Sequence, residues 1–398
     1  MTSSPKGTGP LTGMSGPGIA RTALVHDALT GRGAPERVLL HLAETLSDPV
    51  IVTTAYDPDG TFPEFSRFAV RVLDVPAVGK RPGRPAEQGP TPASAAAFRS
   101  LDLTGADLVV ASTSGSAHHV RHPRKVVYWH DPLRGEDGQP GPEGAGPIRP
   151  PAITTHLRRA EREAVLGASL HATGSHRAAQ RLRTAYGVDA EVLPPPLDTS
   201  ALGESLQEPP WPPRCLVVSR LIAEERVDVA IAACREVGIP LTVIGDGPDG
   251  HRLHEMADGS VTFVSSTNDA ELTAAYRSHS VVLCPGRDDP GLVPLQAGYL
   301  GRPVVASSAG GAMETVLHRE TGWLVGGWDP LDWAKGLTAV LQRRWDLRVL
   351  RSFAERFEPA SFDAGLARWL GRSAAMAGEP RPPWDRSGDL VPGHLLAS

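Results

Sequence analysis

Short β-branched runs alternate with segments of helical period along most of the chain, and this alternation constrains the fold more than any other feature. The apolar runs predict buried parallel strands, and the Ala-, Leu- and Arg-rich segments between them predict helices. Such an alternation folds into doubly wound α/β domains, with helices on both faces of a parallel sheet. In the first half we predict strands at 22–26, 50–55, 69–75, 107–112, 125–129, 169–173 and 191–194, and helices at 35–47, 93–102, 152–166 and 175–185. In the second half we predict strands at 215–219, 241–245, 261–264, 280–284, 303–306 and 322–325, each followed by a helical segment.

A proline-dense stretch interrupts this alternation at 194–213, with the sequence PPPLDTSALGESLQEPPWPP. Proline lacks the N–H group that a sheet needs, so the stretch cannot continue either block of strands. A chain of 398 residues also exceeds the roughly 250–300 residues at which single cores stop growing. We therefore predict a disordered tract at 1–19, a first domain at 20–195, a linker at 196–213, a second domain at 214–358, a terminal helix at 359–378 and a loose tail at 379–398.

Composition excludes several classes of function. A formal net charge of −5 gives no electrostatic reason to expect a nucleic-acid partner. Cys215, Cys234 and Cys284 lack metal-ligand spacing and are expected in the core of a protein in a reducing compartment. The chain has no apolar run long enough for a membrane span, and its first residues have no apolar signal core. We expect a cytoplasmic protein without stable membrane insertion.

The first motif, VHDALTGRGAPERV, places a polar pair at the end of a predicted strand. His26 and Asp27 follow the strand, and a loop containing Gly33 leads into a helix. Such a loop lets backbone N–H groups and a helix N-terminus approach an anion. A second motif, YWHDPLR, places His130, Asp131, Pro132 and Arg134 after another strand. His118, His119 and His122 precede that strand, and we predict that they lie in a surface loop.

Three further motifs follow in the second half. The first, VVSRLIAEERVD, carries Arg220, Glu225 and Arg226, and the second, GDGP, begins a tight turn at Gly245. The third, RDDPGLVPLQ, contains Asp288 and Gln296, with a predicted helix start at Gly291. The free N–H groups of that start can hold a phosphate. Neither a phosphate-loop nor a GxGxxG fingerprint follows a strand, which argues against ATP and nicotinamide chemistry.

In this order, the motifs resemble those of family 4 glycosyltransferases, the glycosyl transferases group 1, over about residues 20–375. The resemblance implies the GT-B fold, in which two Rossmann-like doubly wound domains face each other across a cleft and the terminal helix crosses back to the first domain. It implies catalytic roles for His130 and Arg220, and acceptor-side roles for His26, Asp27 and Arg134. The donor-binding residues that it implies are Gly33, Arg220, Glu225, Gly245, Asp288, Gly291, Leu292, Val293 and Gln296.

Several of these positions depart from the family pattern. Ala34 replaces a second glycine, Glu225 stands where a phosphate-binding lysine is usual, and Asp288 and Gln296 replace two glutamates. A carboxylate beside a diphosphate reverses the local interaction. Three outcomes stay open at this point: Arg226 reaches the phosphates, Glu225 points away from them, or donor binding is weakened.

The expected activity is a retaining, metal-independent transfer of a sugar from a GDP- or UDP-type donor to a small soluble acceptor, with no cofactor. The sequence leaves open whether the acceptor atom is a hydroxyl oxygen, a thiol sulfur or an amine nitrogen. The Arg-rich composition and the altered donor site suggest bacterial secondary metabolism, such as antibiotic biosynthesis. One alternative is a degenerate, non-catalytic partner subunit, and another is a sugar epimerase or a phosphorylase. A homodimer also remains open.

Overall fold

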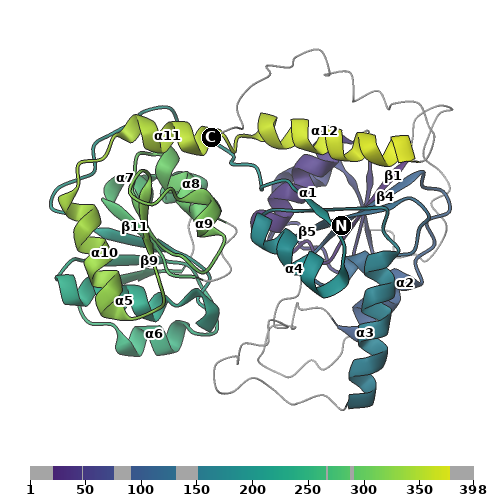
Figure 1. The fold of residues 1–398 in the computed structure, drawn as a ribbon, viewed down its shortest axis with the longest axis horizontal. Helices are drawn as coiled ribbons and strands as arrows, with labels where there is room; N and C mark the ends of the chain where they lie inside the picture. The colour runs from purple at the N-terminus through teal and green to yellow at the C-terminus, as the bar shows by residue number, and fades with distance from the viewer. Residues whose placement is uncertain are drawn as a thin grey trace. The chain divides into compact units, whose positions relative to one another are not determined.

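The structure, a computed structural model, describes residues 21–46, 48–75, 91–130, 151–265, 268–286 and 291–376. Side chains within 151–157 and 374–376 are not described. The chain forms two compact units (Figure 1). The first contains the residues up to Pro194 together with those from Phe362 onward, and the second runs from Pro195 to Ser361.

The first unit is built on a seven-stranded, fully parallel sheet in the order β3-β2-β1-β4-β5-β6-β7. Its strands are β1 (Thr22–His26), β2 (Val50–Thr53), β3 (Ala69–Val72), β4 (Leu108–Thr113), β5 (Lys125–Trp129), β6 (Leu170–Thr173) and β7 (Ala190–Val192). Its helices are α1 (Ala34–Thr45), α2 (Pro92–Arg99), α3 (Pro151–Leu166), α4 (His176–Tyr186) and, from Phe362 onward, α12 (Pro359–Met376), with short 3-10 helices η1 (Pro63–Arg67) and η2 (Ala117–His119).

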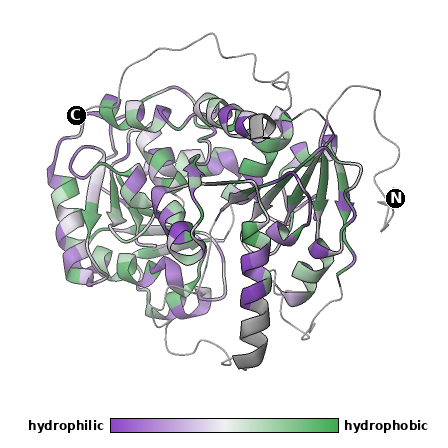
Figure 2. Cartoon of the chain, turned by 45° about the vertical axis from the view of Figure 1, so that its right-hand side comes forward, coloured by the Kyte–Doolittle hydropathy of each residue, from purple (hydrophilic) through white to green (hydrophobic). Residues whose placement is uncertain are grey.

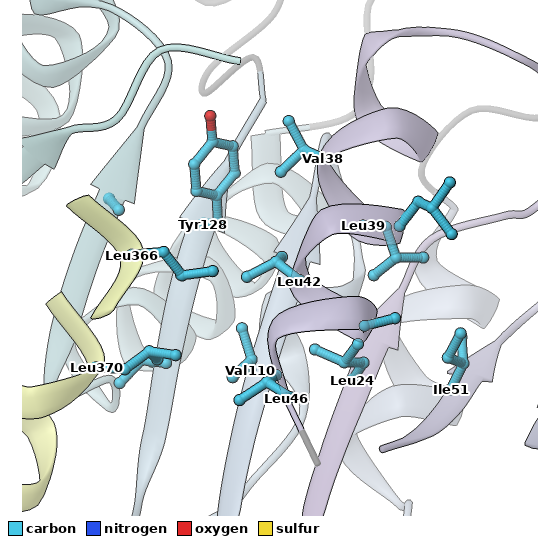
Figure 3. Close-up of a cluster of buried hydrophobic side chains, with 14 of the residues drawn as sticks. Leu24, Val38, Leu39, Leu42, Leu46, Ile51, Val110, Tyr128, Leu366 and Leu370 are labelled. Carbon is cyan, nitrogen blue, oxygen red and sulfur yellow. The ribbon is translucent and has the colours of Figure 1, made fainter. Parts of the chain in front are cut away.

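The terminal helix α12 completes the core of the first unit. Leu366 and Leu370 pack with Leu42 of α1 and with Tyr128 of β5, as Figure 3 shows. The buried Tyr128 hydroxyl donates a 2.6 Å hydrogen bond to the carbonyl oxygen of Leu193, beyond β7. Residues from both ends of the sequence therefore close one hydrophobic core.

The second unit has a six-stranded parallel sheet in the order β10-β9-β8-β11-β12-β13. Its strands are β8 (Cys215–Val218), β9 (Leu241–Ile244), β10 (Val261–Val264), β11 (Val281–Cys284), β12 (Val304–Ser307) and β13 (Gly322–Val325). Its helices are α5 (Val227–Val237), α6 (Gly250–Met256), α7 (Asp269–Ser278), α8 (Leu292–Tyr299), α9 (Ala312–Thr315), α10 (Pro330–Gln342) and α11 (Leu347–Glu355), with the 3-10 helix η3 (Ala223–Glu225). All three cysteines are buried in this unit, as predicted.

The proline-dense segment has no helix or strand, but it packs on the second unit. Leu197 and Leu202 are buried in one of that unit's hydrophobic clusters. The fully buried Arg302 donates a 2.6 Å hydrogen bond to the carbonyl oxygen of Gln207. The stretch predicted as a linker is therefore a folded part of the second unit.

Hydropathy follows this architecture. The strands are mainly hydrophobic, and the helices carry both polar and apolar faces (Figure 2). Among the described residues, no helix combines the length and the apolar character that crossing a membrane requires.

Candidate functional site

Each sheet has a point at which the direction of strand addition reverses. In the first sheet, β2 and β3 lie on one side of β1, and β4 to β7 lie on the other. In the second sheet, the reversal falls between β8 and β11. Open α/β sheets bind ligands beyond the carboxyl ends of their strands at such switch points. The loops after β1, β4, β8 and β11 are therefore the candidate functional sites.

At the first switch point, Asp27 anchors the loop that follows β4. One carboxylate oxygen accepts the N–H groups of Ser114 (2.6 Å) and Gly115 (3.0 Å), and the other accepts those of Ser116 (2.8 Å) and Ala117 (2.7 Å). Charge-assisted hydrogen bonds of this kind are short and strong. Both oxygens are thus engaged, and an acceptor-side role for Asp27 would have to act through the loop that it holds.

His26 and His130 meet at the hydroxyl of Ser112, the fifth residue of β4. His26 Nδ1 lies 3.0 Å from the Ser112 carbonyl oxygen, which accepts only, so that nitrogen carries a proton. Ser112 Oγ lies 3.1 Å from the same nitrogen and 2.7 Å from His130 Nε2. The hydroxyl therefore donates to His130 Nε2, and the proton of a neutral His130 ring lies on Nδ1.

His130 is held as a neutral ring. Burial, with the neighbouring His26 as a second cause, lowers the pKa of His130 well below its ordinary value. The His26 and His130 rings pack edge to face, with their centroids 5.9 Å apart. A neutral Nδ1–H group suits a hydrogen bond to a sugar hydroxyl better than it suits proton transfer. Asp131, Pro132 and Arg134 lie outside the described residues.

The N-terminus of α1 is already capped by a carboxylate. The Gly33 N–H group donates a 3.0 Å hydrogen bond to Glu36 Oε2, a carboxylate of the first helical turn. A Cβ atom on Gly33 would lie 3.0 Å from the same oxygen. A phosphate approaching Gly33, as the sequence predicts, would have to displace the Glu36 side chain.

The histidines before β5 are not a surface loop, which corrects the prediction. His118 and His119 are buried in η2, and their Nε2 atoms lie 2.8 and 2.9 Å from the two carboxylate oxygens of Glu161 on α3. His122 is half-buried and contacts the Ala106 carbonyl oxygen at 3.1 Å. The apolar pattern of the sequence gave no sign that a helix carrying Glu161 would cover the first two rings.

His118, His119 and Glu161 are also the one group of three within the described ranges whose ligand atoms lie close enough together for a metal ion, all within 4.8 Å. However, Arg99 Nη2 donates to His119 Nδ1 at 3.1 Å, and an arginine can only donate. Nε2 of His119 must therefore carry the proton that it gives to Glu161. This arrangement favours a hydrogen-bonded cluster over a metal centre.

Another buried histidine makes the stability of the first unit dependent on pH. Burial is the main cause that lowers the pKa of His171 to about 4, and Trp129 Nε1–H donates to its Nδ1 at 3.1 Å. The folded state then binds fewer protons than the unfolded chain below about pH 6.5, so stability falls as the pH drops from about 6.5 toward 4. A drop in pKa of this size corresponds to about 3 kcal/mol.

We therefore predict that His171→Gln flattens the acid limb of the stability profile. Urea unfolding of parent and variant at pH 7.5 and pH 4.5 measures the effect. At pH 7.5 the His171 ring is neutral in both the folded and the unfolded state, so the measurement at this pH serves as the internal reference. Parallel losses of stability in the two proteins would show that His171 does not titrate on unfolding.

At the second switch point, two glycines let the loops after β8 and β9 touch through their backbones. Gly245 has φ +145°, and a Cβ atom there would lie 1.8 Å from the Ser219 carbonyl oxygen. A Cβ atom on Gly247 would lie 2.3 Å from the Leu221 carbonyl oxygen. Backbone hydrogen bonds from Leu221 N–H to Asp246 and from Asp249 N–H to Leu221 close the contact.

The contacts of the charged residues after β8 show where the Glu225 side chain points. Arg220 Nη2 donates to Glu225 Oε1 at 3.0 Å; the Arg220 side chain is 55% exposed and that of Glu225 is 9% exposed. Arg226 instead makes a two-point ion pair with Asp228, at 3.1 Å for both bonds, and lies over the Trp328 ring. Glu225 thus lies beside Arg220, and Arg226 does not supply a second cation there.

The loop after β11 leads into α8. Gly291 is its N-cap with φ +83°, and a Cβ atom there would lie 2.5 Å from Thr315 Oγ1. Leu292 and Val293 carry N–H groups in the first helical turn, while Pro294 has none. Gln296 Oε1 accepts a 2.8 Å hydrogen bond from the buried Tyr276 hydroxyl. Asp288 lies outside the described residues.

Comparisons with known proteins agree with these features. Residues 212–343 match the family described as Glycosyl transferases group 1. The D-inositol 3-phosphate glycosyltransferase of Mycolicibacterium smegmatis is 31% identical over 188 residues, 43% of each chain. The GDP-mannose-dependent alpha-(1-6)-phosphatidylinositol monomannoside mannosyltransferase of Mycobacterium tuberculosis is 30% identical over 183 residues, 37% of this chain and 46% of the relative. The chain thus matches less than half the length of these relatives.

Solved structures extend the likeness to both units. Anabaena HepE in complex with UDP and glucose has a TM-score of 0.65 at 20% identity, covering 87% of this chain and 98% of that one. Sucrose-phosphate synthase from Thermosynechococcus elongatus has a TM-score of 0.67 at 18% identity, covering 90% and 100%. Residues 212–343 are therefore similar to the glycosyl transferases group 1, and the two units of the chain have the GT-B fold of two Rossmann-like domains.

Proposed function

We propose that the chain is a retaining, metal-independent glycosyltransferase that uses a nucleoside-diphosphate sugar of the GDP or UDP type. The main support is the set of loops at the second switch point. Arg220 follows β8, the Gly245 turn follows β9, and the start of α8 follows β11. An arginine and a helix N-terminus at the carboxyl edge of a parallel sheet suit a diphosphate.

In the proposed reaction, the acceptor oxygen forms a bond to the anomeric carbon while the bond from that carbon to the donor phosphate breaks. The acceptor proton passes to the departing phosphate oxygen on the same face, so the configuration is retained. Arg220 and the N–H groups of Leu292 and Val293 stabilise the charge that develops on the diphosphate. This scheme requires neither a metal ion nor a side-chain nucleophile.

The first unit is proposed to bind the acceptor. His130 offers a neutral Nδ1–H group to a hydroxyl, and His26 supports it through Ser112. Asp27 is unsuited to act as a general base because its oxygens are occupied by backbone N–H groups. A reaction in which the donor phosphate takes the proton agrees with this arrangement.

We propose a small, hydroxyl-rich, soluble acceptor. A relative's name specifies D-inositol 3-phosphate, a polar compound of this kind. A role in bacterial secondary metabolism, including antibiotic biosynthesis, is part of the proposal and is suggested by the altered donor-site residues Glu225 and Gln296. The acceptor atom would be a hydroxyl oxygen, as in the scheme above.

Calorimetric titration with UDP, GDP, dTDP and ADP tests the donor assignment. We expect one nucleotide to bind with a Kd on the order of micromolar. The corresponding nucleotide sugar would then be incubated with polyol acceptors, and the anomeric configuration of the product read by NMR. An inverted product would exclude the retaining scheme, and the lack of any binding nucleotide would exclude the donor class.

We predict that Arg220→Ala raises the Kd of the bound nucleotide about 10- to 100-fold, because a charged hydrogen bond contributes about 1.5–3 kcal/mol. The matched control is Arg235→Ala. Arg235 lies near the C-terminal end of α5, has a similar exposure to Arg220 and forms an ion pair with Asp258. That variant should bind as the parent does. Equal binding by both variants would remove Arg220 from the phosphate site.

A second candidate function is a non-catalytic partner subunit. Two observations favour it: Glu225 neutralises Arg220, and Tyr276 occupies the amide oxygen of Gln296. This candidate predicts no turnover with any nucleotide sugar, even where a nucleotide binds. Single-turnover assays with excess protein distinguish a slow enzyme from an inactive one.

A further inference from the structure

Glu225 is the buried member of the ion pair at the second switch point. It ends η3, its side chain is 9% exposed, and Oε1 accepts from Arg220 Nη2 at 3.0 Å. Burying a carboxylate is costly unless it is paired. A carboxylate in this position is therefore an organised part of the loop and not a solvated surface charge.

The other carboxylate oxygen reaches the strand across the switch point. A Cβ atom on Gly286, two residues after β11, would lie 2.2 Å from Glu225 Oε2 and 3.3 Å from its carboxyl carbon. Gly286 thus leaves the space that Glu225 fills. The carboxyl group sits between the loop after β8, which carries Arg220, and the loop after β11, which leads to α8.

The guanidinium of Arg220 keeps most of its donors. An arginine side chain has five N–H groups in a rigid planar fork, and the pair with Glu225 uses one nitrogen. The Arg220 side chain is 55% exposed. A carboxylate partner that fixes the plane of the guanidinium reduces the rotamer freedom that the arginine loses when it binds an anion.

We propose that Glu225 is a positioning residue, which holds the Arg220 guanidinium in the orientation that binds the donor phosphates. This inference rests on the proposed function, since it assumes a phosphorylated donor at the second switch point. Of the two cations in residues 219–228, Arg226 is tied to Asp228. The phosphates would then meet a single oriented cation in this loop.

The opposite view is that Glu225 repels the phosphates. Repulsion predicts that Glu225→Ala strengthens nucleotide binding. Positioning predicts that Glu225→Ala weakens nucleotide binding, because alanine no longer holds the Arg220 guanidinium in place. Glu225→Gln keeps a hydrogen-bond acceptor at the same place, so it should restore most of the affinity.

The experiment is calorimetric titration of the full chain with UDP and GDP. For the nucleotide that binds, we expect Glu225→Ala to raise Kd about 10-fold and Glu225→Gln about 3-fold or less. In an Arg220→Ala background, Glu225→Ala should have no further effect. A purely structural role would lower binding in that background as well, and would also lower the melting temperature.

Gly286→Ala gives an independent arm. Its added methyl group meets the Glu225 carboxylate, so it should weaken binding about 10-fold in the parent and have no effect in Glu225→Ala. Additive effects of the two changes would overturn the inference. If the parent binds neither nucleotide, the proposed function fails. If the parent binds and Glu225→Ala binds equally or more tightly, the positioning role alone fails.

Discussion

A Gly245→Ala variant is expected to lose most of the stability of the second unit. The new Cβ atom would lie 1.8 Å from the Ser219 carbonyl oxygen and 3.0 Å from its carbonyl carbon, so two backbones would have to separate. Gly245 also has φ +145°, a conformation that side-chain-bearing residues rarely adopt. Together these effects should cost at least about 4 kcal/mol.

The affected contact lies at the carboxyl edge of the sheet. Ser219 N–H bonds to Ile244, and Gly245 N–H bonds to Val264, so β8, β9 and β10 all end there. Amide hydrogen exchange of these strands measures the loss directly, because it reports on the second unit separately from the first. We expect strongly reduced protection in all three strands and loss of nucleotide binding.

Gly238→Ala is the matched control. Gly238 caps α5 with φ +73°, but a Cβ atom there would meet nothing within 4 Å. It therefore tests the left-handed backbone without the clash, at a cost of about 1–2 kcal/mol. Similar losses in both variants would mean that the backbone conformation, and not the approach of Ser219, determines the effect.

The alternation of apolar runs and helical segments in the sequence predicts most of the fold. All predicted strands overlap the observed ones, because parallel strands buried on both faces read as apolar runs whatever their partners. The ends of some strands differ from the prediction: β2 ends at Thr53, whereas the sequence predicts a strand to residue 55. The prediction of a linker at 196–213 differs from the structure, because the two buried leucines of this segment, Leu197 and Leu202, form no periodic apolar pattern in the sequence.

The site residues were less predictable, because their partners lie far away in the sequence. Ser112, which joins His26 to His130, has no motif of its own; its importance follows from the adjacency of β1, β4 and β5. The pairing of Arg220 with Glu225 is local, five residues apart, yet the sequence left its direction open. Burial settles the direction, and burial depends on the strand order around β8 and β11.

The adjacency of β1 and β4 also makes the first unit sensitive to a change at Asp27. Asp27→Asn puts an amide NH₂ group in place of one oxygen, facing two N–H donors of the 114–117 loop. Each unsatisfied buried donor costs about 1–3 kcal/mol. Because some of these N–H groups reach solvent, the free energy of unfolding of the variant should fall by about 2–5 kcal/mol in total. Urea unfolding measures the change.

The matched control is Asp107→Asn, because Asp107 is exposed and accepts a single backbone N–H, from Arg21 at 2.7 Å. It should change stability by about 0.5 kcal/mol or less. The loop that Asp27 holds runs directly from Ser112 and Thr113 into η2, so Asp27→Asn should also release the hydroxyl that orients His130. NMR of labelled histidine would then show His130 exchanging between its two neutral tautomers. If the variant is destabilised but the His130 tautomer is unchanged, Asp27 stabilises the fold and does not orient His130.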